Sequence, residues 1–246
     1  MTIELEHVTR FNGIGGIAPH CVLDDVTFTF PSGRTTGILG LRGSGKTTLI
    51  RLLAGTLPPT GGRIRRRGLV SFPIGSFGWM HRHMTGRENL HFLARIYGLD
   101  ARPIIDFVAA VSGLGAALEM PVQSYSGEKR ARLSFSACYA IPFDVYLADE
   151  FLIGGPPGFR DVCRTMARER QQGATFILAT RSPALIRLFC DTACILDGGS
   201  IRMCATVHDA VAEHAALNEA AAAHEPDDGE QNHDPGFWTE DVSHAA

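Results

Sequence analysis

The sequence predicts an α/β fold organised around a phosphate-binding loop, and three observations support this prediction. A short apolar strand, a glycine-rich loop and an apolar-periodic helix follow one another between residues 35 and 55. Amphipathic helical segments then fill the chain from about residue 80 to 140. A second apolar strand, at 143–150, ends in two adjacent carboxylates. Continuous apolar strands separated by helices are typical of a parallel sheet that is covered on both faces.

The glycine-rich loop matches the pattern G-x-x-x-x-G-K-[ST] at every fixed position. Its glycines let backbone N–H groups curl around phosphate oxygens, and the following helix directs its positive end at them. We expect Lys46 to contact the β- and γ-phosphates and the Thr47 hydroxyl to ligate Mg²⁺. A glycine turn that happens to precede a helix is the alternative, which the flanking elements and the second motif disfavour. The candidate nucleotide-binding residues here are Gly40, Leu41, Arg42, Gly43, Ser44, Gly45, Lys46, Thr47 and Thr48.

Length and charge limit the classes of function. The 246 residues suffice for one large domain or a domain with an inserted subdomain. The formal charge of -3 is uneven, because residues 225–246 hold seven acidic and no basic residues. The remainder is mildly basic, and this charge is too diffuse to indicate nucleic acid binding. We therefore expect no nucleic acid partner.

The cysteines and the hydropathy pattern predict a cytosolic location. The six cysteines form no C-x-x-C pair, and several lie in apolar runs, so we expect reduced core residues. No stretch approaches the roughly 20 apolar residues of a membrane span, and Glu4 and Glu6 interrupt any signal peptide. Any contact with a membrane would be made through a partner.

The first part of the chain predicts strands. Residues 2–9 and 22–30 alternate polar and apolar side chains, as half-buried strands do, and the strand at 35–39 enters the loop. Helix 49–55 ends at a glycine, and residues 63–72 are predicted as a further strand. The run of three arginines at 65–67 fits a solvated strand edge better than a ligand site.

Helices are predicted between the loop and the second apolar strand. Thr85 stands three residues ahead of Glu88, which is a capping-box arrangement, and apolar residues follow it at helical spacing up to Tyr97. Residues 102–118 and 128–141 are predicted as two more helices. This pattern indicates a helical insertion within an α/β core.

The strand at 143–150 supplies the second motif. Ligands gather at the carboxyl ends of parallel strands, so Asp149 is expected to reach Mg²⁺. Glu150 is then placed to hold and deprotonate an attacking water. A solvated strand end is the alternative, which the upstream loop disfavours. A helix at 158–172 and a buried strand at 175–180 follow, and the turn that begins at Arg181 faces the phosphates.

The end of the chain predicts a hairpin, a helix and a tail. Residues 193–201 are predicted as a closing hairpin and 208–224 as an alanine-rich helix, with an acidic, disordered tail beyond it. A metal site among the histidines of this region is conceivable, but a solvated tail is favoured. Those histidines are His208, His214, His224, His233 and His244.

A third motif carries a family resemblance. The segment Gln123-Ser124-Tyr125-Ser126-Gly127-Glu128-Lys129-Arg130 resembles the L-S-G-G-Q signature of ABC transporter nucleotide-binding subunits. The order of loop, helical insertion, signature and Asp-Glu strand is that family's order. The resemblance implies a P-loop NTPase (RecA-like) core with an antiparallel β subdomain and an inserted helical subdomain. It also implies an ATP-binding domain at 1–205, with its helical insertion at about 80–140, and a helix and tail at 206–246.

Within that family the chain looks like the ATP-binding subunits of capsular polysaccharide exporters. The matching segments are Ser71–Gly75, Thr85–Asn89, Ala94–Gly98, Met120-Pro121 and Arg130–Leu133. This resemblance implies an energy-coupling ATPase bound peripherally to the cytoplasmic face of a Gram-negative inner membrane. A membrane permease dimer and a second ATP-binding subunit are the implied partners, in a homodimer or a heterodimer.

The resemblance also implies roles for residues outside the loop. In the family ATP and Mg²⁺ lie between two subunits, and the signature of one faces the phosphate loop of the other. Ser126 and Gly127 are therefore implied contacts of the partner's nucleotide. Phe11 falls where the family stacks an aromatic ring on adenine, and a core phenylalanine is the alternative.

The chain departs from the family pattern at several positions. Glu128 replaces the second glycine of the signature, and Arg181 replaces a histidine that contacts the γ-phosphate. Gly155-Pro156-Pro157-Gly158 stands where relatives carry an aspartate, and no glutamine lies near Ser76. These degenerate motifs leave open a nucleotide-binding structural or regulatory subunit with little hydrolysis. A P-loop kinase or GTPase is disfavoured, because no N-K-x-D segment is present and the signature would be unexplained.

Overall fold

The computed structural model describes residues 2–12 and 20–224, and its centre is a six-stranded sheet with the order β5-β6-β7-β3-β8-β9. The first five strands in this order run parallel, and β9 pairs antiparallel with β8. Their bounds are Val70–Ile74 (β5), Val145–Asp149 (β6), Thr175–Thr180 (β7), Thr35–Leu39 (β3), Thr192–Asp197 (β8) and Ser200–Met203 (β9). Strands β3 and β7 are buried along their whole length, which confirms the sequence prediction of a sheet covered on both faces.

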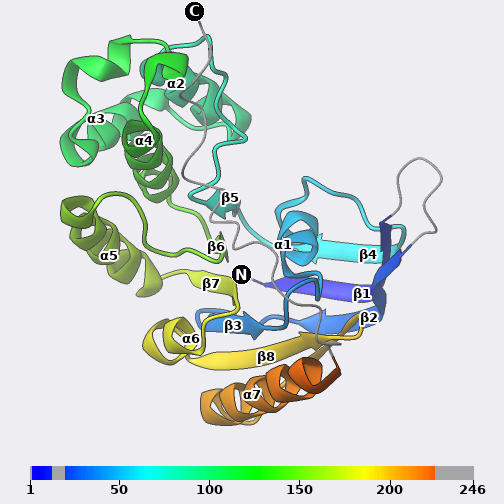
Figure 1. The fold of residues 1–246 in the computed structure, drawn as a ribbon. Helices are drawn as coiled ribbons and strands as arrows, with labels where there is room; N and C mark the ends of the chain where they lie inside the picture. The colour runs from blue at the N-terminus through cyan, green and yellow to red at the C-terminus, as the bar shows by residue number, and fades with distance from the viewer. Residues whose placement is uncertain (1, 13–19, 225–246) are drawn as a thin grey trace, which may run out of the picture.

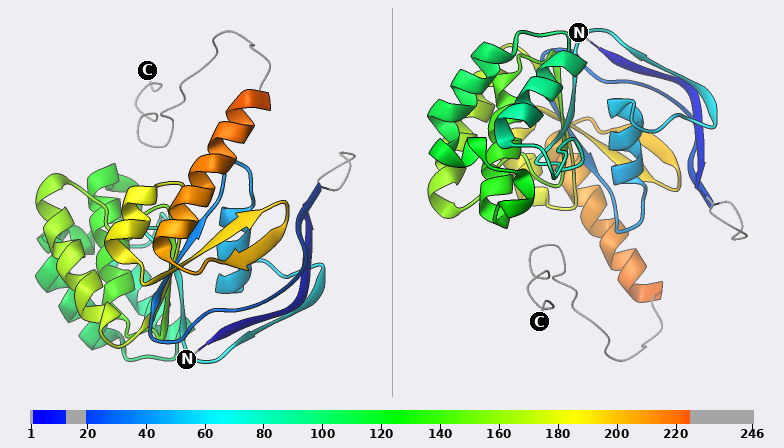
Figure 2. Two further views of the ribbon diagram at one scale, coloured as in Figure 1. Left: turned by 90° about the horizontal axis from the view of Figure 1, so that it is seen from below. Right: turned by 90° about the horizontal axis from the view of Figure 1, so that it is seen from above.

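A second, smaller sheet is antiparallel and has the order β2-β1-β4. It consists of β1 (Ile3–Asn12), β2 (His20–Thr29) and β4 (Gly61–Arg66). Helix α1 (Lys46–Ala54) lies between the two sheets (Figures 1 and 2). Its apolar face, which includes Leu49, closes a core with residues from both sheets, such as Leu5 of β1 and Ile177 of β7. This packing holds the start of α1 firmly against the end of β3.

Three helices form a separate layer between β5 and β6 in the chain. They are α2 (Gly86–Ile96), α3 (Ala101–Ser112) and α4 (Gly127–Ala140), with short 3-10 turns at Gly115–Glu119 and Val122–Ser124. The predicted capping box at Thr85 is present, since Glu88 N donates to Thr85 Oγ1 and Thr85 N donates to Glu88 Oε2. The helical layer stands away from α1 and the small sheet (Figure 1).

The predicted strand at 63–72 is wrong, because this stretch contains two strands of different sheets. Strand β4 pairs with β1 and ends at Arg66, and β5 begins at Val70 beside β6. Between them Gly68 adopts φ +107°, and a Cβ there would lie 2.6 Å from Asp144 Oδ2. The same Asp144 oxygen accepts a hydrogen bond from Leu69 N at 2.7 Å, which fixes the turn. The predicted strands at 35–39 and 175–180 and the predicted helix at 128–141 are confirmed, with bounds that agree within one residue at each end.

One predicted helix and one predicted turn need correction. The predicted helix at 102–118 ends at Ser112, because Gly113 adopts the left-handed φ of +67° that caps a helix. The predicted turn that begins at Arg181 leads into a further helix, α6 (Pro183–Phe189), which Ser182 caps by accepting from Leu185 N at 3.4 Å. Proline at the first helical position fits this start, because its missing N–H would have no helical partner.

The C-terminal part packs on the sheet face opposite α1. Helix α5 (Pro157–Gln171) precedes β7, and α7 (Val207–His224) follows the β8–β9 hairpin and contacts β8, β3 and α6. The far end of α7 projects from the body of the molecule (Figure 2). The predicted tail, with His233 and His244, lies outside the described residues, and no three candidate metal ligands gather among those that are described. Within the described part of the chain, no helix is long and apolar enough to cross a membrane.

Candidate nucleotide site

The phosphate-binding loop joins β3 to α1. Gly43 and Gly45 have φ values of +82° and +97°, and Gly45 is the N-cap of α1. Gly40 has no room for a side chain, since a Cβ would lie 2.5 Å from Ser44 Oγ and 2.6 Å from the Leu196 carbonyl oxygen. Glycine is therefore required at these three positions by backbone conformation or by close approach. Arg42 and Gly43 are exposed at the outer edge of the loop, where a ligand can reach their backbone.

Lys46 lies at the centre of the loop and is only 6% exposed. Its Nζ donates to the carbonyl oxygens of Gly40 at 2.7 Å and Leu41 at 2.8 Å. Burial lowers the pKa of Lys46, and the charges of Glu150 and Asp149 partly offset this. An ammonium group that is poorly solvated gains strongly from an anionic ligand, so the site favours phosphate.

Asp149 ends β6, next to the loop. Burial raises the pKa of its carboxyl group, a hydrogen bond with Thr47 lowers it, and the neighbouring Glu150 charge raises it again. The two predicted Mg²⁺ ligands, Thr47 and Asp149, are thus in contact. Thr47 and Asp149 offer two oxygen ligands, which suit a hard divalent cation. Burial removes water from the Asp149 carboxylate, as its raised pKa indicates, and a bound cation would compensate for that loss. The residues present therefore fit Mg²⁺.

Glu150 follows Asp149 in an unusual backbone conformation. Its φ is +66°, a left-handed value that costs a non-glycine residue about 1–2 kcal/mol. The turn is held by Glu150 N, which donates to the Ala179 carbonyl at 2.7 Å. It directs the carboxylate to the end of β7, where Oε2 accepts from Thr180 Oγ1 at 2.9 Å and from Arg181 N at 3.2 Å.

Arg181 lies over the same carboxylate. Its Nε is 3.4 Å from Glu150 Oε1, and the two side chains are 59% and 31% exposed. A pair this exposed is weak, so either partner can leave it at little cost. The structure thus places Arg181, which replaces the family's histidine, directly beside Glu150, the predicted base.

Phe11 lies near the end of β1 and is 44% exposed, so it is not a core residue. Its neighbour Asn12 donates from Nδ2 to Thr48 Oγ1 at 3.4 Å, which connects this strand end to the loop. A ring that is open to solvent beside the loop is available for stacking. Asn12 was not among the residues singled out from the sequence, because no motif marks it.

The signature segment begins α4. Ser126 caps this helix by accepting from Lys129 N at 3.3 Å, and Gly127 has nothing within 4 Å of the position of a Cβ. Glu128 Oε1 accepts from Arg132 Nε at 3.0 Å, one helical turn further along. Glu128 therefore turns away from the exposed start of the helix, and its charge is paired. Because α4 belongs to the helical layer, away from α1, Ser126 and Gly127 are not part of their own chain's loop site (Figure 1).

The carboxyl ends of β3, β6 and β7 bring predicted site residues together with Thr180, which was not predicted. In the sheet, Leu39 pairs with Thr180 and Asp149 with Ala179, so β3, β6 and β7 end side by side. Thr180 was missed as a site residue, since an ordinary strand threonine carries no sequence signal. The Gly155-Pro156-Pro157-Gly158 segment spans the start of α5 and carries no acidic side chain. At Ser76 the backbone carbonyl accepts from Ser134 Oγ of α4 at 2.6 Å.

The fold and this site define an ATP-binding cassette protein. The family model for the ABC transporter matches residues 23–152, more than half of the chain. The chain belongs to the ABC transporter ATP-binding family. The chain is an ABC-type ATPase, and its relatives are ATP-binding subunits of ABC exporters, which pair with membrane permeases and dimerise.

The curated relatives of this chain include a capsule polysaccharide export protein and a polysialic acid transport protein. The chain is 39% identical to the capsule polysaccharide export ATP-binding protein CtrD of Neisseria meningitidis serogroup B, over 80% of this chain and 91% of that protein. It is 37% identical to the ATP-binding protein BexA of Haemophilus influenzae, over 72% and 82%. It is 33% identical to the polysialic acid transport ATP-binding protein KpsT of Escherichia coli, over 74% and 82%.

Solved structures share the fold. An ATP-binding subunit of an ABC transporter superposes with a TM-score of 0.70 at 22% identity, covering 91% of this chain and 99% of that chain. A dimeric ATP-binding cassette in a post-hydrolysis state, bound to ADP and phosphate, has a TM-score of 0.68 at 19% identity, over 82% and 97%. These matches confirm the predicted P-loop NTPase fold with its two subdomains.

Proposed function

We propose that the protein is the energy-coupling subunit of an exporter of capsular or other cell-surface polysaccharide. The observation that carries this proposal is the 39% identity to CtrD over 91% of that protein. The ATP-binding domain spans residues 1–205, and α7 with the tail is an addition to it. The subunit is bound to the cytoplasmic face of an inner membrane through its permease.

The loop and the ends of β6 and β7 are proposed to perform hydrolysis. The loop backbone and Lys46 hold the β- and γ-phosphates, while Thr47 and Asp149 hold Mg²⁺, which would neutralise phosphate charge. Glu150 orients a water and accepts its proton. Arg181 lies 3.4 Å from that carboxylate and is proposed to leave it for the γ-phosphate when ATP binds, because guanidinium groups bind phosphate oxygens strongly. Glu150 is thereby freed to act as the base.

The second half of each site is proposed to come from the partner subunit. Ser126 and Gly127 are accessible at the start of α4, where backbone N–H groups and the helix dipole favour an anion. Two subunits arranged head to tail would place this helix start at the partner's γ-phosphate. The pairing of Glu128 with Arg132 removes the repulsion that an unpaired carboxylate would cause there.

A cavity of about 270 Å³ is the proposed contact for the permease. It lies between the segment after β5 and the start of α4, and it is lined by Phe77, Met80, Arg82, Val122, Gln123 and Arg130. Apolar walls with two arginines suit a short permease helix that carries apolar and acidic side chains. Ser134 Oγ, bonded to the Ser76 carbonyl at 2.6 Å, connects this cavity region to the signature helix.

The export function is tested in the source cells by removing the gene. We expect surface polysaccharide to disappear and polymer to accumulate inside the cell, with both reversed by the wild-type gene. An Arg82→Glu, Arg130→Glu variant should fail to restore export while its purified form still hydrolyses ATP, because both side chains are exposed and only the permease contact is lost. Normal surface polysaccharide in the deletion strain would overturn the proposed function. Full export by the double variant would overturn only the cavity as the contact.

Phe11 is proposed to stack on adenine, and Phe11→Ala tests this. Loss of one aromatic–base stack costs about 1–3 kcal/mol, so we expect the KM for ATP to rise about tenfold with kcat little changed. Phe11→Tyr should behave as wild type, because it keeps the ring. Phe92, which is 48% exposed on α2, supplies a control, and Phe92→Ala should leave KM unaltered. An unchanged KM in Phe11→Ala would remove Phe11 from the site.

A further inference from the structure

The left-handed turn at Glu150 needs support from the residues around it. A non-glycine residue keeps a positive φ, here +66°, only when its surroundings fix it. Before the turn, β6 is fixed in the sheet, and Glu150 N donates to the Ala179 carbonyl. After the turn, residues 151–155 form neither a helix nor a strand. The support on this second side therefore comes from packing against other elements.

Helix α4 supplies that packing through two aromatic side chains. Tyr139 is fully buried, and its hydroxyl donates to the Leu152 carbonyl oxygen at 2.7 Å. One turn earlier, Phe135 lies against Gly154, where an added Cβ would be 2.3 Å from Phe135 Cζ. The same ring atom would be 2.9 Å from a Cβ at Gly75, which follows β5. The ring therefore has room in this place only because both positions are glycine.

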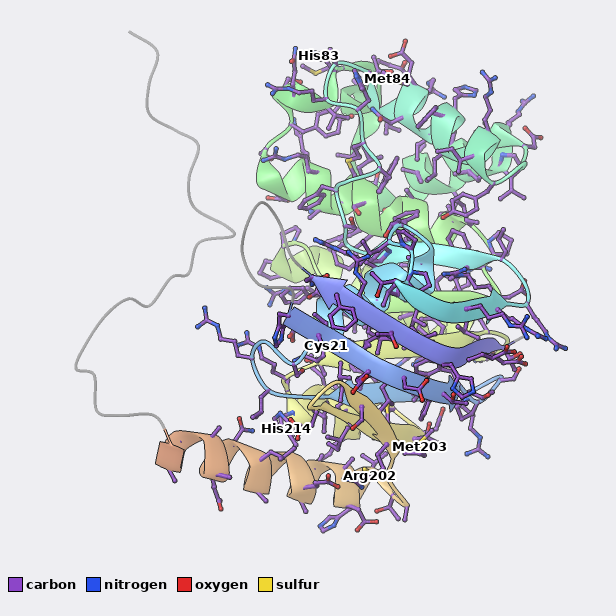
Figure 3. All side chains as sticks on the ribbon, turned by 90° about the vertical axis from the view of Figure 1, so that its right-hand side faces the viewer. Cys21, His83, Met84, Arg202, Met203 and His214 are labelled. Carbon is purple, nitrogen blue, oxygen red and sulfur yellow. The ribbon has the colours of Figure 1, made fainter. Side chains whose placement is uncertain are left out.

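Helix α4 extends from the signature segment to the neighbourhood of β6. The turn ahead of it is bonded to the helical layer, since Val122 N donates to the Met84 carbonyl oxygen at 2.9 Å. Figure 3 shows Met84 and its neighbour His83 at the end of the molecule remote from α7. From there α4 reaches Ala140, and β6 begins at Val145. The helix that starts at the signature thus ends beside the chain that follows β6.

We infer that Tyr139 and Phe135 are positioning residues for hydrolysis, which hold the turn at Glu150 and so keep its carboxylate at the end of β7. Tyr139 fixes the residue two positions after the base, and Phe135 fixes the residue four positions after it. Both side chains are buried, so they act through Glu150 and not on the substrate. This inference rests on the proposed role of Glu150 as the base.

Tyr139→Phe in the full-length protein tests the inference by removing one oxygen atom. We expect kcat for ATP to fall about fivefold to tenfold, which is the change that loss of one hydrogen bond produces in an equilibrium. The Kd for Mg-ATP should stay within about twofold of wild type, because Tyr139 bonds to the chain after the base and not to the loop.

Tyr146→Phe is the matched control. Tyr146 is equally buried, and its ring stacks on that of Tyr139 with 6.0 Å between the ring centroids. Its hydroxyl donates to the Ile141 carbonyl oxygen at 2.7 Å, ahead of β6 and not after it. Both variants should lose similar thermal stability, but only Tyr139→Phe should lose turnover. A purely structural role of the two hydroxyls would not separate them.

Gly154→Ala tests the ring contact. The φ of Gly154 is not left-handed, so alanine fits the backbone and its methyl group meets only the Phe135 ring. We expect kcat to fall about tenfold, and the added substitution Phe135→Leu, which withdraws the ring, to restore it to within about threefold of wild type. Gly158→Ala is the control, since nothing lies within 4 Å of a Cβ there.

The outcomes separate the inference from the proposed function. If Gly154→Ala does not fold, the two tyrosine variants decide the question. Equal turnover in Tyr139→Phe and Tyr146→Phe would overturn the inference, as would a loss in Gly154→Ala that persists in the folded double variant. Undiminished turnover in Glu150→Gln would instead contradict the proposed base, and the inference with it.

Discussion

Glu150→Gln is expected to reduce ATP turnover at least about 100-fold, because a general base contributes about 10²–10⁴-fold to such a rate. Glutamine has nearly the same shape and can still accept from Thr180 Oγ1, which lies 2.9 Å from Oε2. It cannot take a proton from water, so the chemical step is lost while binding is kept. Turnover is measured as phosphate release at saturating Mg-ATP, and affinity by equilibrium binding.

The structure adds a second expectation for this variant. Without the carboxylate, Arg181 loses its partner at 3.4 Å and is free for the phosphates. Glu150→Gln should therefore bind ATP as tightly as wild type or more tightly, and it should accumulate as an ATP-bound dimer. Glu169 is an exposed carboxylate of α5, so Glu169→Gln is the matched control. This variant should keep wild-type turnover and ATP affinity, and it should not accumulate as an ATP-bound dimer. Undiminished turnover in Glu150→Gln would show that another group takes the proton.

Lys46→Ala is expected to weaken Mg-ATP binding by about ten- to a hundredfold, since charge-assisted hydrogen bonds contribute about 1.5–3 kcal/mol each. Turnover should become undetectable, because the same ammonium group stabilises charge on the transferred phosphoryl group. The variant also removes the donor that lies 2.7 Å from Gly40 and 2.8 Å from Leu41, so its stability must be measured. Thermal unfolding without nucleotide provides that measurement.

Two companions distinguish loss of charge from loss of packing. Lys46→Met keeps most of the buried stem and should unfold near the wild-type temperature, yet bind ATP as poorly as Lys46→Ala. Arg168→Ala removes an exposed cation on α5 and should change neither binding nor stability. Wild-type affinity in Lys46→Met would mean that the backbone N–H groups of the loop hold the phosphates without this side chain.

Arg181 and Glu128 are two positions at which the chain departs from the family pattern, and the structure shows what each side chain contacts. The exposed pair with Glu150 is weak, so it does not by itself block the base. The substitution at Glu128 is also compensated, through the pair with Arg132. Both departures are therefore compatible with the ATPase activity of the family.

Much of the fold could be predicted from the sequence because its signals are local. The buried strands at 35–39 and 175–180 are continuous apolar runs, and the capping box at Thr85 is a pattern of four residues. Predictions failed where a single glycine redirected the chain. Gly68 divides a predicted strand between two sheets, and Gly113 ends a predicted helix, and neither glycine is distinguished in sequence from one that a strand or helix tolerates.

The residues of the candidate site likewise divide into those that a sequence motif marks and those that only the fold brings together. The loop, Lys46, Thr47 and the Asp149-Glu150 pair could be predicted from the sequence alone, because a phosphate cradle and a carboxylate at a strand end depend on residues that are adjacent in the chain. Even the pair of Glu128 with Arg132 is local, at helical spacing of four. Only the tertiary structure placed Arg181 on Glu150 and Asn12 beside Thr48. Those contacts join residues 31 and 36 positions apart, and no periodicity or motif encodes a contact that depends on how whole strands and helices pack.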